Sequence, residues 1–247
     1  MIRPAPDWAL PRVFAHRCGG ALAPENSLSG LRIAAALGCR AVEFDVMLSA
    51  DGSPWLIHDE TLESTTNGVG RVSETPDLVL RGLDAGSYRH PAFVGEALPT
   101  FEQAALLCRE LGLMVNVEIK PATGLEALTG AVVARRILAL WDGAPLPLVS
   151  SFSALTLTAA RHVAPRLPLG ALWVRPPVDW VRQLESLRGY SLHCAWDMLD
   201  NDVLDAAQAR AIPVLCYTVN DRLAAEALYA RGVSSVFSDR IDTMIRM

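Results

Sequence analysis

Long uninterrupted apolar runs are missing from this chain of 247 residues, although 51% of its residues are hydrophobic. A membrane-spanning helix needs about 18 or more consecutive apolar residues, and no stretch approaches that length. The opening residues, MIRPAPDWALPR, also lack the apolar core that follows the basic residue of a secretory signal. We therefore expect a soluble, cytoplasmic protein without a membrane span.

Blocks of basic residues and paired cysteines are absent as well. The 22 Lys and Arg are outnumbered by 27 Asp and Glu, which gives a formal net charge of -5, so nucleic acid is not expected as a partner. The five cysteines are odd in number and contain no Cys-x-x-Cys spacing, which favours reduced thiols over a zinc or redox site. They are Cys18, Cys39, Cys108, Cys194 and Cys216.

What the chain does have is a regular alternation of short apolar runs and amphipathic stretches. The runs predict eight strands, at residues 13–15, 41–47, 114–119, 148–152, 167–174, 191–196, 212–218 and 234–238. Stretches with apolar residues at i, i+3 and i+4 predict helices between them, at residues 27–37, 100–111, 125–140, 154–163, 178–187, 201–210 and 222–230. This alternation predicts an α/β fold, a (β/α)8 TIM barrel, as a single domain over residues 1–247.

One region interrupts the alternation. Residues 61–99 contain scattered glycines and prolines and only short apolar runs, which predicts a small, irregular insertion in the second βα connection. Because such connections emerge at the catalytic face of a barrel, we expect the insertion to lie over the site and narrow access to it.

Carboxylates occur within the predicted strands. Glu43 and Asp45 alternate with Val42 and Phe44, so a strand directs both acids to one face. Glu118 ends a later strand and would reach the same end of the barrel. Three converging carboxylates repel one another unless a cation joins them, which favours a hard divalent metal ion, Mg2+ or Ca2+. The alternative is ordinary ion pairing, of Glu43 and Asp45 with Arg40 or Arg71, and of Glu118 with Lys120.

Two histidines follow apolar runs in the same part of the chain. His16 comes directly after Val13–Ala15 and His58 directly after 55–57, so both are expected at strand ends. Two imidazoles at one site can act as general base and general acid. Arg17 offers a planar fork for a phosphate and Lys120 a second cation. A phosphoryl centre fits this set of residues.

The remaining histidines and the aromatic residues are less specific. His90 and His162 are expected to be structural or solvated, and for His193 a structural and a functional role are equally plausible. Aromatic residues end several later strands, where they would either line a pocket for glycerol or a choline-like head group or pack between barrel and helices. They are Phe152, Trp173, Trp196 and Tyr217.

Six ordered motifs make the chain resemble the glycerophosphodiester phosphodiesterase family, and most closely its bacterial cytoplasmic members. They are His16-Arg17-Cys18-Gly19-Gly20 with Pro24-Glu25-Asn26-Ser27, Glu43-Phe44-Asp45-Val46, Asp51-Gly52, His58-Asp59, Asn116-Val117-Glu118-Ile119-Lys120 and Tyr217-Thr218-Val219-Asn220. The resemblance implies a (β/α)8 barrel with a small insertion. It also implies hydrolysis of glycerophosphodiesters, such as glycerophosphocholine or glycerophosphoethanolamine, to sn-glycerol 3-phosphate and an alcohol, in glycerol and lipid metabolism.

The resemblance also implies roles for particular residues. It assigns His16 and His58 to acid/base catalysis, with either one as the initial base, and a divalent metal, Mg2+ or Ca2+, to Glu43, Asp45 and Glu118. Phosphate contacts fall to Arg17 and Lys120. In the implied course the glycerol 2-hydroxyl attacks phosphorus and water then opens the cyclic phosphate; direct attack by metal-bound water is the alternative. Glu25 and Asn26 are expected to fix the turn after His16, and Asn26 also to reach the metal site.

Two departures and three alternatives stay open at this stage. Cys18 stands where the family commonly has glycine, either as an apolar filler or as a group that crowds the site, and Ser27 replaces threonine as a helix cap. Another barrel phosphodiesterase, acting on lysophospholipid or inositol phospholipid head groups, is the nearest alternative. An amidohydrolase-type barrel is disfavoured, because His16 lacks a His-x-His partner. A non-catalytic phosphodiester-binding barrel is the alternative from a different class. Either a monomer or a homodimer is compatible with the sequence.

Overall fold

The computed structural model describes residues 4–245. Within them, eight parallel strands pair in the order β1, β9, β8, β7, β6, β5, β4 and β2, and pairing of β1 with β2 closes the ring. The (β/α)8 TIM barrel is therefore confirmed. Its strands are β1 (Val13–Ala15), β2 (Ala41–Leu48), β4 (Met114–Ile119), β5 (Leu148–Ser151), β6 (Leu169–Trp173), β7 (Ser191–Ala195), β8 (Val214–Tyr217) and β9 (Ser235–Ser238).

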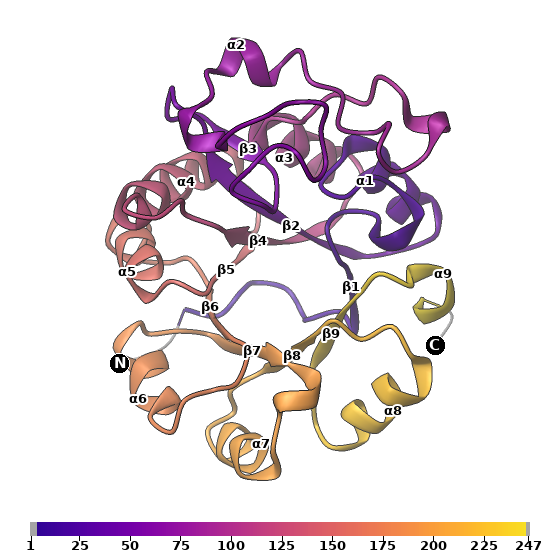
Figure 1. Cartoon of the computed structure of the whole chain (residues 1–247). Helices are drawn as coiled ribbons and strands as arrows, with labels where there is room; N and C mark the ends of the chain where they lie inside the picture. The colour runs from indigo at the N-terminus through magenta and orange to yellow at the C-terminus, as the bar shows by residue number, and fades with distance from the viewer. Residues whose placement is uncertain (1–3, 246–247) are drawn as a thin grey trace.

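Helices surround this ring on the outside (Figure 1). The seven predicted helices all form, and each begins and ends within two residues of its expected bounds. They are α1 (Leu28–Ala36), α3 (Phe101–Glu110), α4 (Glu126–Leu140), α5 (Ala154–Val163), α6 (Trp180–Ser186), α7 (Asn201–Gln208) and α8 (Arg222–Ala230). Side-chain caps explain several starts, because Ser27, Thr100 and Ser153 each accept a hydrogen bond from the first turn of the helix that follows. A short helix near the end of the chain, α9 (Ile241–Met244), is unpredicted.

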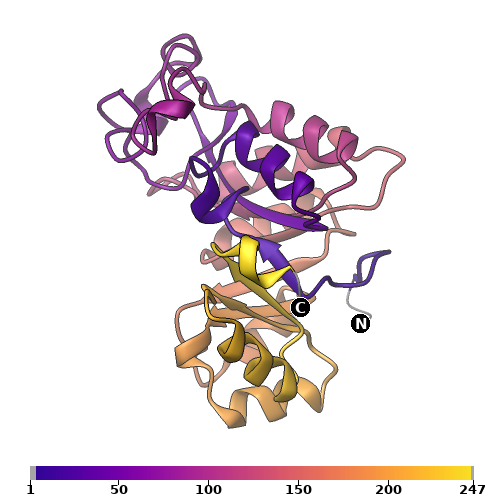
Figure 2. The same ribbon diagram turned by 90° about the vertical axis from the view of Figure 1, so that its right-hand side faces the viewer.

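One strand lies outside the barrel. Residues Pro54–Leu56 form β3, which runs antiparallel to β2 and pairs Leu56 with Val46. The apolar run before His58 is thus the return arm of a hairpin and does not belong to the parallel ring. The segment between β3 and α3 holds only the short elements η2 (Val72–Glu74), α2 (Asp77–Leu80) and η3 (Pro91–Phe93). It protrudes at one corner of the molecule (Figure 2).

The barrel interior is apolar at one end and polar at the other. Phe14, Ala41, Leu148, Leu215 and Phe237 form a buried cluster across the ring. Side chains of a strand alternate between its two faces, so the residue two positions further along each strand also faces inward, closer to the carboxyl end. Two of these inward residues are His16 and Glu43. The apolar cluster therefore fills the barrel on the amino-terminal side of the polar residues, which lie at its carboxyl end.

The main hydrophobic core lies between the barrel and the surrounding helices. Phe101 of α3 contacts both Phe44 of β2 and Trp141, with ring centroids 6.1 Å apart in each case. Residues of the β3–α3 segment form a second, smaller core with Met47 and Trp55. Across residues 4–245, none of the helices combines the length and the apolar character that crossing a bilayer requires.

Candidate active site

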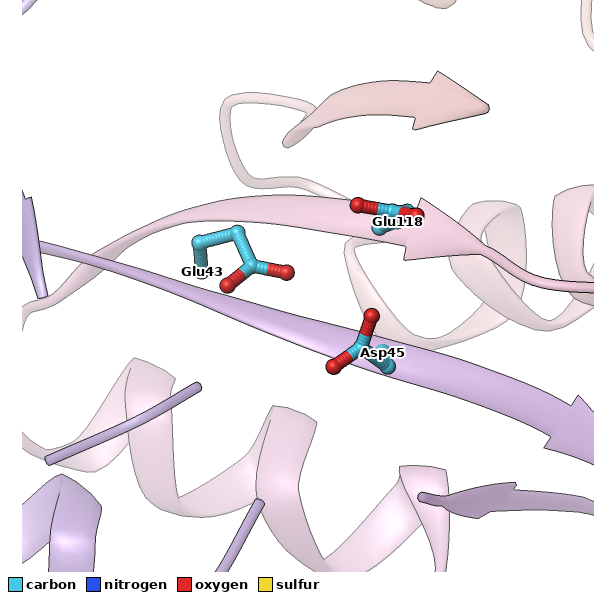
Figure 3. A group of neighbouring side chains, drawn as sticks. All are labelled: Glu43, Asp45 and Glu118. Carbon is cyan, nitrogen blue, oxygen red and sulfur yellow. The ribbon is translucent and has the colours of Figure 1, made fainter. Parts of the chain in front are cut away.

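The register between β2 and β4 brings the three predicted carboxylates together. Asp45 is paired directly with Glu118, and Glu43 with Asn116, two positions before Glu118. One oxygen of each carboxylate lies within 4.8 Å of the other two. Figure 3 shows Glu43 and Asp45 on one ribbon and Glu118 on its neighbour, with the carboxylates close together. Neighbouring parallel strands thus build a cluster from residues that are 75 positions apart in the sequence.

This cluster has an unfavourable electrostatic environment. Burial raises the pKa of Glu43 well above its usual value, and the charges of Asp45 and Glu118 raise it further. Burial, followed by the charge of Asp45, also raises the pKa of Glu118, to about 8. Glu43 Oε1 is buried without a hydrogen-bond partner. A cation placed among these oxygens would stabilise the ionised carboxylates and satisfy the unpaired atom.

Two asparagines surround the carboxylates. Asn26 donates through Nδ2 to Asp45 Oδ2 at 2.9 Å and accepts from the Asp45 backbone N at 3.0 Å, so it fixes this carboxylate. Its φ of 55° is left-handed, a region that asparagine tolerates better than most residues. Asn116, at the barrel centre, donates to Ser150 Oγ at 2.9 Å and leaves a buried Oδ1 unpaired. The Asn-Val-Glu-Ile-Lys motif was the only sequence signal for Asn116.

His16 and Arg17 lie at the carboxyl end of β1. His16 Nδ1 is 2.7 Å from Asp239 Oδ1, and its Nε2 is 4.0 Å from Glu43 Oε2. The backbone N of Arg17 donates to Glu43 Oε2 at 2.9 Å, and its Nη1 donates to Glu25 Oε2 at 2.8 Å. Burial by itself lowers the pKa of Arg17, but Asp45, Glu25 and Glu43 together raise it above its usual value. The turn after β1 therefore supplies a permanently charged guanidinium beside the carboxylates.

His58 and Lys120 form the opposite side of the site. His58 Nδ1 is 2.6 Å from Asp59 Oδ1, whose second oxygen accepts from Ser64 Oγ at 2.7 Å. His58 Nε2 is 2.9 Å from Lys120 Nζ. Lys120 Nζ also lies 3.8 Å from Glu118 Oε1, so the ion pair that was the alternative for Glu118 forms within the cluster. Arg40 and Arg71 were the alternative partners of Glu43 and Asp45, and Arg71 contacts Glu60 instead.

The two histidines, the two cationic side chains, the three carboxylates and Asn116 line a single pocket of about 230 Å³. Its lining residues are His16, Arg17, Glu43, Asp45, His58, Asn116, Glu118, Lys120, Phe152, Leu172, Tyr217, Thr218 and Phe237. A larger hollow of about 610 Å³ lies elsewhere, between α8 and residues 38–40 that follow α1, and is lined by none of the predicted site residues.

The predicted aromatic residues divide into two groups. Phe152 and Tyr217 line the pocket and contact each other edge to face, with centroids 6.2 Å apart. Tyr217 Oη donates to the Trp173 carbonyl at 3.0 Å, which holds its ring across the mouth of the barrel. Trp196 lies in the turn after β7, half-exposed, and the structure does not bring it to the pocket lining. Trp173 is likewise outside the lining.

The remaining histidines and Cys18 lie apart from the pocket lining. His90 and His162 are exposed, while His193 is fully buried, with its Nε2 2.9 Å from Ser191 Oγ. Burial lowers the pKa of His193 to about 3, so it is a neutral core residue. Cys18 is completely buried in the hydrophobic core, and burial raises the pKa of its thiol well above the usual value.

Residues 61–99 contact the turn after β1 without lining the pocket. Tyr88 Oη accepts a hydrogen bond from the Glu25 backbone N at 3.0 Å. The Glu96 carboxylate accepts from both the backbone N and the Oγ of Ser29, and the Arg89 guanidinium contacts the Ala21 carbonyl. Residues 61–99 thus support the turn that carries Arg17.

The carboxyl end of this (β/α)8 barrel holds buried carboxylates, two imidazoles and two cationic side chains. Such a site can bind a phosphodiester and catalyse its hydrolysis. Comparison with known proteins agrees. Residues 16–243 match the model of the glycerophosphoryl diester phosphodiesterase family, and the chain belongs to this family. It is therefore a phosphodiesterase, an enzyme that hydrolyses phosphoric diesters.

Individual relatives cover nearly the whole chain. A phosphodiesterase from Oleispira antarctica, solved in complex with the product sn-glycerol-3-phosphate, is 35% identical, with a TM-score of 0.93 over 96% of each chain. A glycerophosphodiester phosphodiesterase from Caldanaerobacter subterraneus subsp. tengcongensis is 29% identical over 95% of this chain and 96% of its own. A structure from Silicibacter pomeroyi DSS-3, described as a putative enzyme of this type, has a TM-score of 0.84 at 24% identity and supports the fold.

Proposed function

We propose that the protein hydrolyses glycerophosphodiesters, such as glycerophosphocholine or glycerophosphoethanolamine, to sn-glycerol 3-phosphate and an alcohol. The observation that carries this proposal is the convergence of His16, His58, Arg17, Lys120 and the carboxylate cluster on one pocket of about 230 Å³. The Oleispira antarctica relative, solved with sn-glycerol-3-phosphate, supports the same class of product.

A divalent cation fits the carboxylate cluster. Glu43, Asp45 and Glu118 offer hard oxygen donors from two adjacent strands, and both Mg2+ and Ca2+ prefer such ligands. When bound, the cation would supply positive charge to the phosphate oxygens and keep the carboxylates ionised. Asn26 would orient Asp45 towards it, because both of its amide atoms are already bonded to that residue.

Arg17 and Lys120 would bind the phosphodiester from two sides. Arg17 lies beside Glu43 and Asp45, and Lys120 lies beside Glu118 and His58. Their positive charges would offset the charge that develops on the phosphate oxygens during attack. The aromatic side chains of Phe152 and Tyr217 remain for the glycerol or the alcohol portion, including a choline-like cation.

The two histidines would move the protons. One imidazole removes the proton of the glycerol 2-hydroxyl, whose oxygen attacks phosphorus in line, and the other protonates the departing alcohol oxygen. Water then opens the resulting cyclic phosphate with the two roles reversed, which restores both imidazoles. A substrate without the 2-hydroxyl separates this course from direct attack by water, because it is cleaved only in the second case.

A coupled assay for glycerol 3-phosphate tests the function. We expect release from glycerophosphocholine that stops with a chelator and returns with Mg2+ or Ca2+. His16→Ala and His58→Ala should each lower kcat by at least about 10²-fold, while His162→Ala, at an exposed position on α5, should leave it unchanged. Binding of glycerol 3-phosphate without any turnover would instead support a non-catalytic barrel.

We also propose that residues 1–247 form one catalytic domain in which residues 61–99 are an insertion. Its contacts with the turn after β1, through Tyr88 and Glu96, give it the role of supporting Arg17. Tyr88→Phe, which removes the hydroxyl acceptor of the Glu25 backbone N, should raise KM for the substrate more than it lowers kcat.

A further inference from the structure

His16 is held by a carboxylate from the opposite end of the sequence. Its Nδ1 lies 2.7 Å from Oδ1 of Asp239, which follows β9. A carboxylate at this position keeps the proton on Nδ1 and leaves the lone pair of Nε2 free. The free nitrogen of His16 is on the side of Glu43, 4.0 Å from Oε2, and the ring lines the pocket. The orientation of Nε2 towards the pocket therefore depends on Asp239.

Asp239 is itself held by Asn220, which follows β8. Asn220 Nδ2 donates to Asp239 Oδ2 at 3.0 Å, and Asn220 Oδ1 accepts from the Asp239 backbone N at 2.8 Å. The same Oδ1 accepts from Ser238 Oγ at 3.1 Å. The amide orientation of Asn220 is thereby determined, because its oxygen has donors on its side and its nitrogen has the carboxylate.

The turn after β1 packs tightly against the same residue. The Asp239 carbonyl accepts from the Ala21 backbone N at 2.8 Å. Gly20 has a φ of 56°, and a Cβ at that position would lie 2.4 Å from the Asp239 carbonyl oxygen. No larger side chain fits this approach. Three loops, those after β1, β8 and β9, therefore meet at Asp239 and set its position relative to His16.

We propose that Asp239, fixed by Asn220, is the positioning residue that sets the tautomer and the ring orientation of His16. The inference rests on the acid/base role given to His16 in the proposed function. The other imidazole has a similar arrangement, with Asp59 on Nδ1 of His58, but there the carboxylate is the next residue in the chain. A purely structural role, in which Asn220 and Asp239 only tie two loops together, leaves the contact with His16 Nδ1 without consequence.

The two explanations differ in what Asp239→Asn would do. Asn220 presents its Nδ2 to one oxygen of Asp239, so an amide introduced there must turn its oxygen towards Asn220 and its NH2 group towards His16. The imidazole Nδ1 must then accept a hydrogen bond, and the proton moves to Nε2. The substitution should therefore invert the tautomer of His16 while the loops stay connected.

Nitrogen-15 NMR of the imidazole ring measures the tautomer of His16 directly. In the full-length protein at alkaline pH, where imidazoles are neutral, we expect the wild type to show His16 protonated at Nδ1 and Asp239→Asn to show it protonated at Nε2. The His16 signals are identified by their loss in His16→Ala. Asp242→Asn is the matched control, because Asp242 is close in sequence but pairs with Arg240 on the surface.

Kinetics supply the second measurement. Asp239→Asn should lower kcat about 10²–10⁴-fold with KM and metal affinity changed less than about threefold, and Asn220→Ala should lower kcat by a smaller factor. A His16 ring that keeps its tautomer in Asp239→Asn, or a kcat within threefold of the wild type, would overturn the inference. Failure of the proposed function would look different: the wild type would release no glycerol 3-phosphate, while the tautomer measurement would still report on Asp239.

Discussion

The carboxylate cluster should make the metal-free protein less stable as the pH rises. Burial, and then the charge of Asp45, raise the pKa of Glu118 from 4.5 to about 8. Burial raises the pKa of Glu43 as well. Between pH 4.5 and 8 the folded protein therefore keeps protons that the unfolded chain has released. Stability is at its maximum, for these groups, below pH 4.5, and it is lost as the pH rises towards 8.

The size of the effect follows from the shift. For Glu118 alone, about three and a half pH units at about 1.4 kcal/mol per unit give an upper limit of about 5 kcal/mol. The Glu118 side chain is 12% exposed, and solvent partly screens its charge, so we expect a loss of about 2–4 kcal/mol. This is a large part of the roughly 5–15 kcal/mol that stabilises a typical protein.

Urea unfolding between pH 5 and 8.5, followed by tryptophan fluorescence in the presence of a chelator, measures this loss. Saturating Mg2+ or Ca2+ should remove most of the pH dependence, because a bound cation favours the ionised carboxylates. Glu118→Gln should make the slope shallower. Glu226→Gln, which removes an exposed partner of Arg222, should leave it unchanged. Parallel slopes for the wild type and Glu118→Gln would refute the reasoning.

Three further predictions concern single residues around the site. Asn26→Gly tolerates the φ of 55° but removes both hydrogen bonds to Asp45, so calorimetry should show divalent-ion binding weakened about 10–100-fold; unchanged affinity would contradict this. Cys18→Gly removes the strain of a left-handed φ of 74°, about 1 kcal/mol, but loses the burial of a thiol that stabilises the fold by a similar amount. Stability in urea and kcat should therefore both change little. A thiol reagent should not inhibit the folded wild type. Lys120 is the only lysine in the sequence, so its acetylation can be followed by peptide mass spectrometry. Activity should fall at least tenfold in step with the acetylation of Lys120, and bound glycerol 3-phosphate should protect Lys120 from the reagent. Full activity after complete acetylation would exclude a phosphate-binding role for Lys120.

The elements of the barrel were predictable because their signals are local. The alternation of Val42, Glu43, Phe44 and Asp45 identifies a strand with two faces, and β2 (Ala41–Leu48) is buried along its whole length. Five of the seven predicted helices, α1, α3, α5, α7 and α8, begin at a residue whose side chain caps the first turn. Convergence of the acids on β2 and β4 was also predictable, since parallel strands bring their carboxyl ends to one edge of the barrel.

Features that depend on strand direction were not predictable from apolar runs alone. The apolar run 55–57 was expected to be a strand that ends at His58, yet the observed strand β3 (Pro54–Leu56) turns back against β2 in a hairpin. β-propensity reports how well a side chain fits a half-buried sheet surface and not the direction of pairing. The composition of the run therefore does not distinguish a parallel strand from an antiparallel one. Trp196 shows a similar limit: its position at the end of β7 was evident, but its half-exposed orientation in the following turn was not.

By itself the sequence determined the barrel, its helices and most of the charged residues of the site, because these are encoded by periodicity and by motifs within short segments. Only the tertiary structure decided which partners complete the site. Asp239 lies 223 residues from His16 in the chain and joins it only because β9 pairs with β1 as the barrel closes. Its anchor, Asn220, belonged to a recognised motif, but its hydrogen bonds to Asp239 form only because the ends of β8 and β9 lie side by side.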